Sequence, residues 1–381
     1  MNICMNRPSM KAYSVGINPT ASHASERTLM HPLRSLATAA LVALVLTSLA
    51  VPTAIAGTID WVTVGDPGNT ADTDPSGFGA VATSYQIMKY EFTNQQYTDF
   101  LTSVAATDTY ALYNEKMGSD ARGGITQGGT SGSYTYATRT NMGDKPVNFV
   151  SWFDAARVSN WLMNGGTSSS STETGAYTLI GGQTSGTAPA VNPGATFYIP
   201  TEDQWYKAAY YKGGGTNAGY WDYATQSDSV PTAVTAGSTG IGSSGSAGNS
   251  ANWNRSADWN DQNGNVTTVG TNGGASAYGA FDQSGNVYEW NDLTGAAGSS
   301  RGMRGGSWGN FNPFYLSSSF SNPSDDPSYE GIGIGFRLAS PVSGPSAVPE
   351  IDPNSLGSVL ALVVGSLGLL ERRRMKVKLA V

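Results

Sequence analysis

The chain contains very few of the side chains that bind soft metals or act as nucleophiles. Its 381 residues include one cysteine and two histidines, and 13% of them are charged, compared with about 25% in an ordinary soluble domain. Cys4, His23 and His31 all lie near the N-terminus. Without that segment the chain would have no thiol for a disulfide, no imidazole base and no histidine to ligate a metal.

The N-terminal region has the features of an export signal that is removed. Segment 30–56 starts with Met and a weakly basic stretch, continues as an uncharged apolar run over 36–49, and ends in Ala54-Ile55-Ala56. Small residues at this spacing are typical of a signal-peptidase cleavage site. We interpret 1–29 as an extension upstream of the true start and 30–56 as a signal peptide. The exported chain would then contain neither cysteine nor histidine.

The C-terminal tail has a second pattern connected with export. Val348-Pro349-Glu350-Ile351-Asp352-Pro353 precedes an apolar segment at 356–370, and Arg372-Arg373-Arg374 follows. This tail, 348–381, resembles a PEP-CTERM sorting signal, which implies cleavage by an exosortase. The alternative is a plain membrane anchor. The apolar segment is short for a span, which needs about 17–25 residues, and the arginines that follow it would stay on the cytoplasmic side. Both interpretations place 57–347 outside the cytoplasmic membrane, in the cell envelope, at the surface or in the medium.

The region between the two processing signals is acidic. Residues 57–347 contain 12 Lys and Arg and 24 Asp and Glu. Such a surface repels phosphate backbones, so a nucleic acid is not an expected partner. The excess of carboxylates is compatible with divalent cations and with neutral sugars.

Three segments have the apolar spacing of amphipathic helices, and each follows a residue that can cap it. The segments are 94–104, 152–164 and 202–211. The caps are Thr93 or Asn94, Ser151 with Asp154, and Thr201 with Gln204. The glycine- and serine-rich stretches at 123–136, 165–193 and 233–250 have too few apolar residues to form a core, so we expect surface loops there.

Six phrases along the chain carry a resemblance to a known family. They are KYEFTNQQY, KPVNFVSWFDAARVSNWL, YIPTEDQWYKAAYY, FDQSGNVYEW, MRGGSWGN and GIGIGFRLA, in this order. Their residues and their order resemble the formylglycine-generating enzyme family, also called the sulfatase-modifying factor domain family, over about 65–339. The resemblance implies one domain at 57–347 with an α+β, C-type-lectin-like fold and little regular secondary structure.

The resemblance also implies two structural calcium sites, whose ligands are oxygens because calcium is a hard cation. The first matches Asp282, Gly285, Val287 and Glu289, and the second matches Asn252, Trp253, Asp261 and Asn263. In the first site, the carboxylates of Asp282 and Glu289 would bind the ion, together with backbone carbonyls that the turn at Ser284-Gly285-Asn286 directs at it. The alternative is that both carboxylates accept bonds from backbone amides within a turn.

The positions that carry the family's chemistry are changed in this chain. The family oxidises a cysteine of its substrate to formylglycine and uses two cysteines that bind copper. Asn310 and Tyr315 occupy the matching positions, and neither an amide nor a phenol replaces a thiolate on Cu(I). Iron-dependent relatives use histidine ligands, which the exported chain would lack. We therefore expect no copper, no iron and no catalytic residue of the family's reaction.

Two other features of the C-terminal stretch bear on function. Asp325, Asp326 and Glu330 could support glycoside hydrolysis as paired carboxylates, although a loop such as SNPSDDPS is more typical of solvated turn residues. Aromatic residues also alternate with amides, a combination that suits sugars or extended peptides. These predicted ligand-binding residues are Trp308, Asn310, Phe311, Asn312 and Tyr315.

Together these observations predict a non-catalytic binding or structural module of the cell envelope. We expect calcium to stabilise it and a glycan or a peptide to be its ligand. The alternative hypothesis is a divergent oxidoreductase of the formylglycine-generating or non-haem iron family, with unconventional metal ligands.

Overall fold

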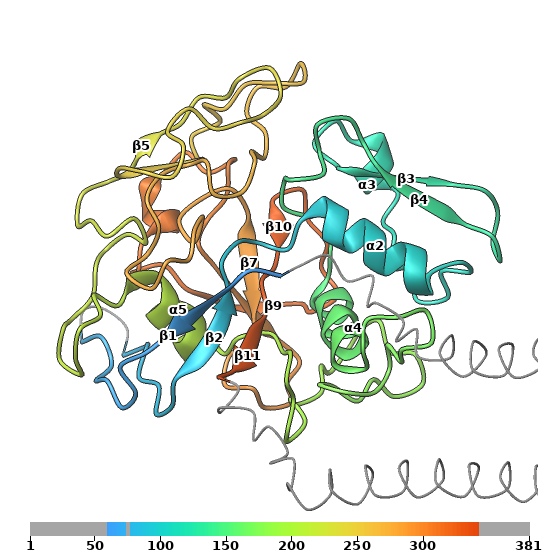
Figure 1. The fold of residues 1–381 in the computed structure, drawn as a ribbon, viewed down its shortest axis with the longest axis horizontal. Helices are drawn as coiled ribbons and strands as arrows, with labels where there is room; N and C mark the ends of the chain where they lie inside the picture. Colours follow the sequence, from blue (N-terminus) through green and yellow to red (C-terminus); the bar gives the residue numbers. More distant parts are fainter. Residues whose placement is uncertain (1–58, 74–76, 343–381) are drawn as a thin grey trace, which may run out of the picture. The chain divides into compact units, whose positions relative to one another are not determined.

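The computed structural model describes residues 59–73 and 77–342 (Figure 1). The predicted signal peptide at 30–56 and the predicted sorting tail, with its apolar segment at 356–370, lie outside these residues. In the part of the chain that is described, no helix is both long enough and apolar enough to cross a membrane.

Three helices occupy the predicted segments, and each begins with a capping box. They are α2 (Asn94–Val104), α4 (Trp152–Met163) and α5 (Glu202–Tyr210). At the start of α2, the Thr93 hydroxyl accepts a bond from the backbone amide of Gln96, and the Gln96 side chain accepts one from the amide of Thr93. Reciprocal capping satisfies amides that a helix start leaves unpaired. Two short turns, α3 (Lys116–Ser119) and η1 (Pro313–Leu316), are additional to the prediction.

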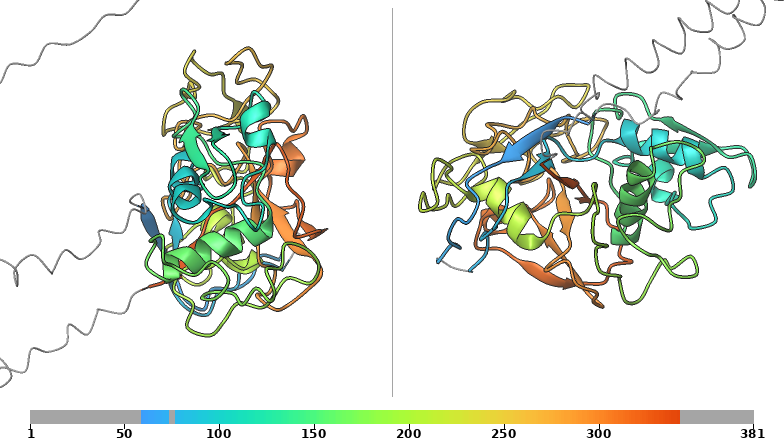
Figure 2. Two further views of the ribbon diagram at one scale, coloured as in Figure 1. Left: turned by 90° about the vertical axis from the view of Figure 1, so that its right-hand side faces the viewer. Right: turned by 60° about the horizontal axis from the view of Figure 1, so that its bottom comes forward.

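Helices α2 and α4 lie side by side and enclose the largest part of the core (Figures 1 and 2). The rings of Phe100 on α2 and Trp161 on α4 have centroids 5.4 Å apart. Trp152, at the start of α4, packs edge-on against Tyr177 with a centroid distance of 5.0 Å. All four side chains are fully buried, and burial of large aromatic side chains is the main stabilising contribution in such a core.

The strands are short and form two main sheets. The first contains β1 (Trp61–Val64), β2 (Tyr85–Met88) and β11 (Ala339–Pro341), all antiparallel with β2 in the centre. The second has the order β10 (Ile334–Gly335), β7 (Tyr288–Asn291), β8 (Arg301–Arg304) and β9 (Asn322–Asp325). In it β10 is parallel to β7 and the other pairs are antiparallel.

Two further pairs complete the regular structure. They are β3 (Ile125–Gly128) with β4 (Thr135–Thr138), antiparallel, and β5 (Thr232–Ala233) with β6 (Ser250–Ala251), parallel. No described strand exceeds four residues, which confirms the expected α+β fold with little regular secondary structure. Because β1 and β11 both pair with β2, the first and last strands of the described domain lie on one sheet.

Ion pairs of buried arginines hold segments of the domain together, and two of them join residues 102 and 48 positions apart. The guanidinium groups of four arginines are at most 1% exposed and each lies within 2.7 Å of a carboxylate. The pairs are Arg157–Glu173, Arg301–Asp292, Arg304–Glu202 and Arg337–Glu289. The described residues contain no cysteine, so these ion pairs and the aromatic core stabilise the domain without the disulfides found in many small domains.

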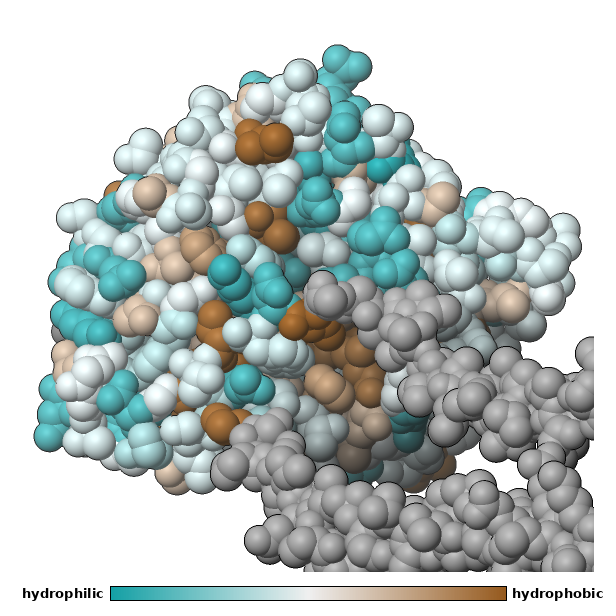
Figure 3. Space-filling model, viewed as in Figure 1, coloured by the Kyte–Doolittle hydropathy of each residue, from teal (hydrophilic) through white to brown (hydrophobic). Residues whose placement is uncertain are grey.

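The face of the molecule drawn in Figure 3 is mostly hydrophilic or intermediate in hydropathy, with hydrophobic residues in small separate patches. Large exposed apolar side chains are therefore worth locating individually, because contiguous exposed apolar surface often marks a binding site.

Candidate functional site

The turn at 282–287 brings the two predicted calcium segments into contact. Asp282 and Asn286 have positive φ values of 62° and 63°, and Gly285 has a φ of 100°. A Cβ on Gly285 would lie 2.5 Å from the carbonyl oxygen of Asn252, so the position requires glycine. The backbone amide of Asn286 donates to the same carbonyl at 2.8 Å.

Asn286 is the centre of a buried polar network. Its Oδ1 accepts bonds from Nδ2 of Asn252 at 3.1 Å and from the backbone amide of Thr267 at 3.0 Å. Its Nδ2 donates to Oε2 of Glu91 at 2.7 Å, and the amide of Val287 donates to Oε1 of Glu91 at 3.2 Å. Glu91 is fully buried and was not predicted as a site residue. The only signal for it was a lone carboxylate between aromatic residues in KYEF.

Glu289 is held by two donors. Arg337 donates from Nε to Oε2 and from Nη2 to Oε1, both at 2.6 Å, and Nε1 of Trp205 donates to Oε2 at 2.7 Å. All three side chains are fully buried. Oε2 therefore accepts two bonds already, and the guanidinium charge lies against both oxygens. This geometry is that of a bidentate ion pair.

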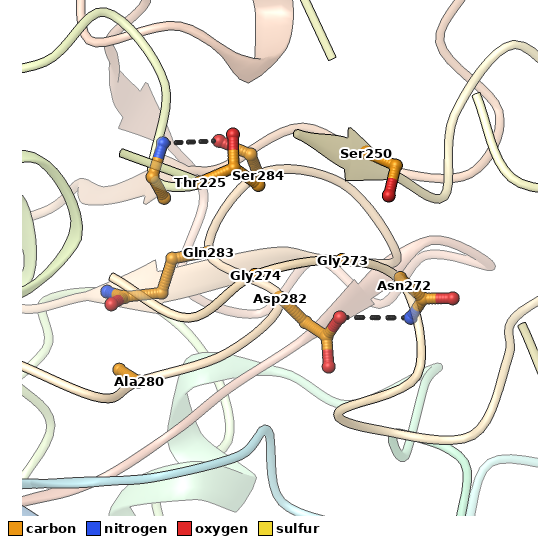
Figure 4. A pocket seen from close by; sticks show the side chains of 10 residues that line it. Thr225, Ser250, Asn272, Gly273, Gly274, Ala280, Asp282, Gln283 and Ser284 are labelled. Carbon is orange, nitrogen blue, oxygen red and sulfur yellow. Dashed lines mark hydrogen bonds between the residues drawn. The ribbon is translucent and has the colours of Figure 1, made fainter. Parts of the chain in front are cut away.

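Asp282 lies beside a small polar cavity. Its Oδ2 accepts a bond from the amide of Gly270 at 2.5 Å, and its Oδ1 accepts one from Nδ2 of Asn272 at 2.9 Å. With Ser250, Asn272 and Gln283 it lines a cavity of about 10 Å³ (Figure 4), which is room for about one water or one ion. Oε1 of Gln283 is buried and has no hydrogen-bond partner.

The second predicted calcium set is spread over different environments. Asn252 is fully buried, Trp253 is half-buried, and Asp261 and Asn263 are exposed. Oδ1 of Asn252 is buried without a partner, and the carbonyl of Asn263 accepts a bond from Nη2 of Arg122 at 3.0 Å. Within residues 59–73 and 77–342, no three His, Cys, Asp or Glu side chains are grouped to hold a metal.

The two positions that match the family's cysteines lie in the turn after β8. Gly306 has a φ of 73°, and a Cβ on it would lie 2.9 Å from the carbonyl oxygen of Tyr315, so glycine closes this turn. Oδ1 of Asn310 accepts bonds from the amide and the hydroxyl of Ser307 at 2.6 and 3.2 Å. The ring of Tyr315 packs edge-on against Phe320 with a centroid distance of 5.0 Å.

The predicted ligand-binding residues divide into exposed and buried side chains. Phe311 is 62% exposed and Tyr315 is 37% exposed, while Asn312 is exposed and Asn310 is half-buried. Trp308 is only 4% exposed and packs in a core cluster with Met142, Trp259, Val266 and Val287. The structure thus places Phe311, Asn312 and Tyr315 at the surface and Trp308 beneath it.

Comparison with known proteins identifies the family. The family model of the sulfatase-modifying factor enzyme 1-like domain matches residues 62–342. The chain belongs to this family. Its C-type-lectin-like, α+β fold is the one expected from the sequence. No curated protein matches the chain.

Similar solved structures share low identity with this member of the sulfatase-modifying factor family. CarF is 22% identical, with 75% of this chain and 99% of that chain covered and a TM-score of 0.45. Treponema denticola variable protein 1 is 17% identical, with 75% and 97% covered and a TM-score of 0.41. PvdO from Pseudomonas aeruginosa is 19% identical, with 74% and 92% covered and a TM-score of 0.37.

The calcium that the family implies fits the first set of residues in part. Glu289 is engaged by Arg337, so in this arrangement it does not fit as a calcium ligand. The cavity beside Asp282 is lined by side chains that carry carboxylate, hydroxyl and amide oxygens, those of Asp282, Ser250 and Asn272, and such oxygens are the donors that a hard cation takes.

The charge in this region is unbalanced. Glu91, Asp282 and Glu289 all act electrostatically on one guanidinium, that of Arg337. Burial, followed by the charges of Asp282 and Glu289, raises the pKa of Glu91 well above the usual value of a glutamate. Burial also raises the pKa of Asp282. The excess negative charge can be balanced by a proton on Glu91 or by a bound cation.

The copper that the family uses does not fit the residues present. Soft Cu(I) selects sulfur ligands, whereas Asn310 offers an amide oxygen that is already bonded to Ser307. Burial raises the pKa of the neighbouring Tyr288 to about 12, while its hydrogen bond with Asn310 opposes the shift, so this phenol stays neutral. The side chains here supply hydrogen bonds and aromatic surface, and we derive no redox step from them.

Two arginines that were not predicted lie at the same turn. The guanidinium of Arg255 is 4.8 Å from the centroid of the Phe311 ring, and that of Arg122 is 4.6 Å from the Trp308 ring. The backbone amide of Arg255 also donates to the carbonyl of Trp308 at 2.9 Å. No sequence signal pointed to them, because they lie more than 50 residues before the turn that they contact.

Proposed function

We propose that this protein is an exported, non-catalytic binding module of the cell envelope, and that it binds its ligand at the turn 310–315. One observation carries the proposal. By the resemblance, Asn310 and Tyr315 stand where the family has its two copper-binding cysteines, and the aromatic side chains of the same turn, led by Phe311, are exposed. Exposed aromatic faces beside amides suit the apolar and polar sides of a sugar or an extended peptide.

We further propose that calcium stabilises the domain from the cavity beside Asp282. The interior there contains more carboxylates than guanidinium groups, and an ion in this position would offset the excess charge. This role is structural, since the cavity is lined by residues of the 272–284 segment with Ala224, Thr225 and Ser250, and not by residues of the exposed turn.

Metal content and enzymatic activity of the purified protein test the absence of catalysis. We expect calcium without stoichiometric copper or iron, and no oxygen consumption with a cysteine-containing peptide. Stoichiometric copper or iron together with oxygen consumption on that peptide would favour the divergent oxidoreductase and overturn the proposal.

A glycan and peptide array tests the binding role. Phe311→Ala and Tyr315→Ala remove exposed aromatic faces and should abolish binding to any array ligand while leaving the melting temperature nearly unchanged. Ile180→Ala is the matched control, since Ile180 is 81% exposed on a loop outside the turn. Binding that survives both aromatic substitutions would show that the ligand lies elsewhere.

A further inference from the structure

We propose that the surface around Phe311 binds a carboxylate-bearing sugar, such as a hexuronate unit, through the guanidinium groups of Arg122 and Arg255. The inference rests on the binding function proposed above and names the chemistry of its ligand. Burial lowers the pKa of Arg122, Asp120 raises it, and the positive charge of Arg255 lowers it again. The two guanidinium groups are therefore close enough to repel each other.

Neither of these arginines has an acidic partner among the residues that the structure describes. Four other arginines of the domain form ion pairs at 2.6–2.7 Å with buried or half-buried carboxylates: Arg157, Arg301, Arg304 and Arg337. The nearby carboxylate of Asp120 accepts a bond from the backbone amide of Arg122 at 2.9 Å instead. In a region with twice as many acidic as basic residues, two neighbouring guanidinium groups without an ion pair form a local positive site. Nε and Nη2 of Arg122 already donate to the carbonyls of Gly264 and Asn263, so Arg122 contributes mainly its charge and Arg255 the paired hydrogen bonds.

The backbone holds both arginines in place. Asn254 and Arg255 have positive φ values of 60° and 53°, a backbone conformation that residues other than glycine rarely adopt. Their amides are fixed by bonds to the carbonyls of Asn310 and Trp308 at 2.8 and 2.9 Å. Such a conformation persists only where the surrounding contacts impose it, so Arg255 is presented at this turn by the fold.

Gly264 links the two arginines. A Cβ on Gly264 would lie 2.6 Å from Cα and Cβ of Arg255, so only glycine allows this close approach. The carbonyl of Gly264 accepts a bond from Nε of Arg122 at 2.8 Å. Gly264 therefore packs against the backbone and the side-chain stem of Arg255, and its carbonyl holds the guanidinium group of Arg122.

The combination of groups selects an acidic sugar. A guanidinium group binds a carboxylate through two parallel hydrogen bonds, and the apolar face of a sugar ring stacks on an aromatic ring such as Phe311. A neutral sugar would leave the arginines unpaired. A peptide of acidic residues alone, such as tetraglutamate, would pair with them but has no apolar ring face to stack on the exposed aromatic side chains. A long polyanion would be repelled by the acidic remainder of the domain.

Calorimetric titration of the purified protein with tetragalacturonate tests the inference, with its methyl ester and tetraglutamate as comparison ligands. We expect tetragalacturonate to bind about tenfold more tightly than the ester or the peptide, and to bind less tightly as salt is added. Arg255→Gln should weaken it about tenfold, Arg255→Lys should weaken it less, and Lys212→Gln, at a half-buried lysine outside the turn, should not change it.

Each outcome separates the ligand chemistry from the binding function. Equal affinity for the acid and its ester, or no effect of Arg255→Gln, would overturn the carboxylate inference while leaving a sugar-binding turn. Equal or tighter binding of tetraglutamate would assign the site to peptides and overturn the sugar. Absence of binding to all three probes would also overturn this inference, and the array with Phe311→Ala would then decide separately whether the turn binds anything.

Discussion

Replacement of Arg337 by methionine tests how the polar interior holds this domain together. Arg337 lies between β10 and β11 and pairs with Glu289 on β7, so it connects the two main sheets. Methionine has a similar length but no charge and no donor. The substitution would leave Glu289 buried with Glu91 and Asp282 nearby and no guanidinium among them.

The magnitude follows from the bonds that are lost. Removing one partner of a buried ion pair costs about 3–5 kcal/mol. The carbonyls of Met88 and Phe281, which accept bonds from Arg337 at 3.1 and 2.7 Å, would also lose a donor, at about 1–3 kcal/mol each. A loss of about 5–11 kcal/mol compares with a total stability of about 5–15 kcal/mol for a domain, so Arg337→Met should be largely unfolded or strongly destabilised.

A second substitution keeps this prediction testable. Adding Glu289→Gln removes the unpaired carboxylate, so the double variant should be more stable than Arg337→Met by about 1–4 kcal/mol. Urea unfolding followed by tryptophan fluorescence measures both, and Lys212→Met, at an exposed pair separated by 4.0 Å, should change stability by less than about 1 kcal/mol. The reasoning fails if Arg337→Met costs under about 1 kcal/mol, or if the second substitution adds to the loss.

Three further predictions concern pH, backbone and calcium. Burial, followed by the charge of Glu330, raises the pKa of Asp154 to about 8. The domain should therefore lose stability as the pH rises from about 4 to 8. In unfolding experiments across that pH range, Asp154→Asn should show a smaller loss of stability than the unchanged protein. Gly285→Ala should lower the free energy of unfolding by about 2 kcal/mol more than Gly245→Ala. Both glycines have positive φ, but only a Cβ at Gly285 would meet a backbone atom. Equal losses of stability in the two variants would show that φ alone matters. Chelation of calcium should lower the melting temperature. The decrease should be larger at pH 8 than at pH 5, because at low pH the carboxylates bind protons in place of the ion. An unchanged melting temperature at both pH values would count against a structural ion.

The helices could be predicted because their signals are local. Thr93 and Gln96 stand three residues apart, so both partners of the capping box are visible in one short stretch of sequence. The apolar spacing that follows then fixes the buried face of α2, which the structure confirms at Asn94–Val104. The glycine-rich stretches were predicted less well, because surface loops were expected at 123–136 and 165–193. The first contains β3 and the start of β4, with Ile125 fully buried, and the second contributes the fully buried Tyr177 to the core.

The polar network could not be predicted, because its partners are distant in sequence. Glu91 and Asn286 are 195 residues apart, and nothing near either residue indicates the other. Glu289 was predicted as a calcium ligand from a motif that contains no arginine, while its partner Arg337 stands in a different motif. Pairing of this kind depends on the register of strands β7 and β10, which only the folded chain establishes.

The same reasoning explains why one turn holds both a buried and an exposed aromatic residue. Trp308 and Phe311 are three residues apart in a segment with no helix or strand period, so hydropathy alone does not decide which one faces the core. Trp308 is buried by apolar side chains of other segments, namely Met142, Trp259, Val266 and Val287. The amides of Asn254 and Arg255 bond to the carbonyls of Asn310 and Trp308, and the guanidinium of Arg255 lies over the exposed ring of Phe311. The turn thus contacts the core through Trp308 and the proposed binding face through Phe311, and both contacts involve residues distant in sequence.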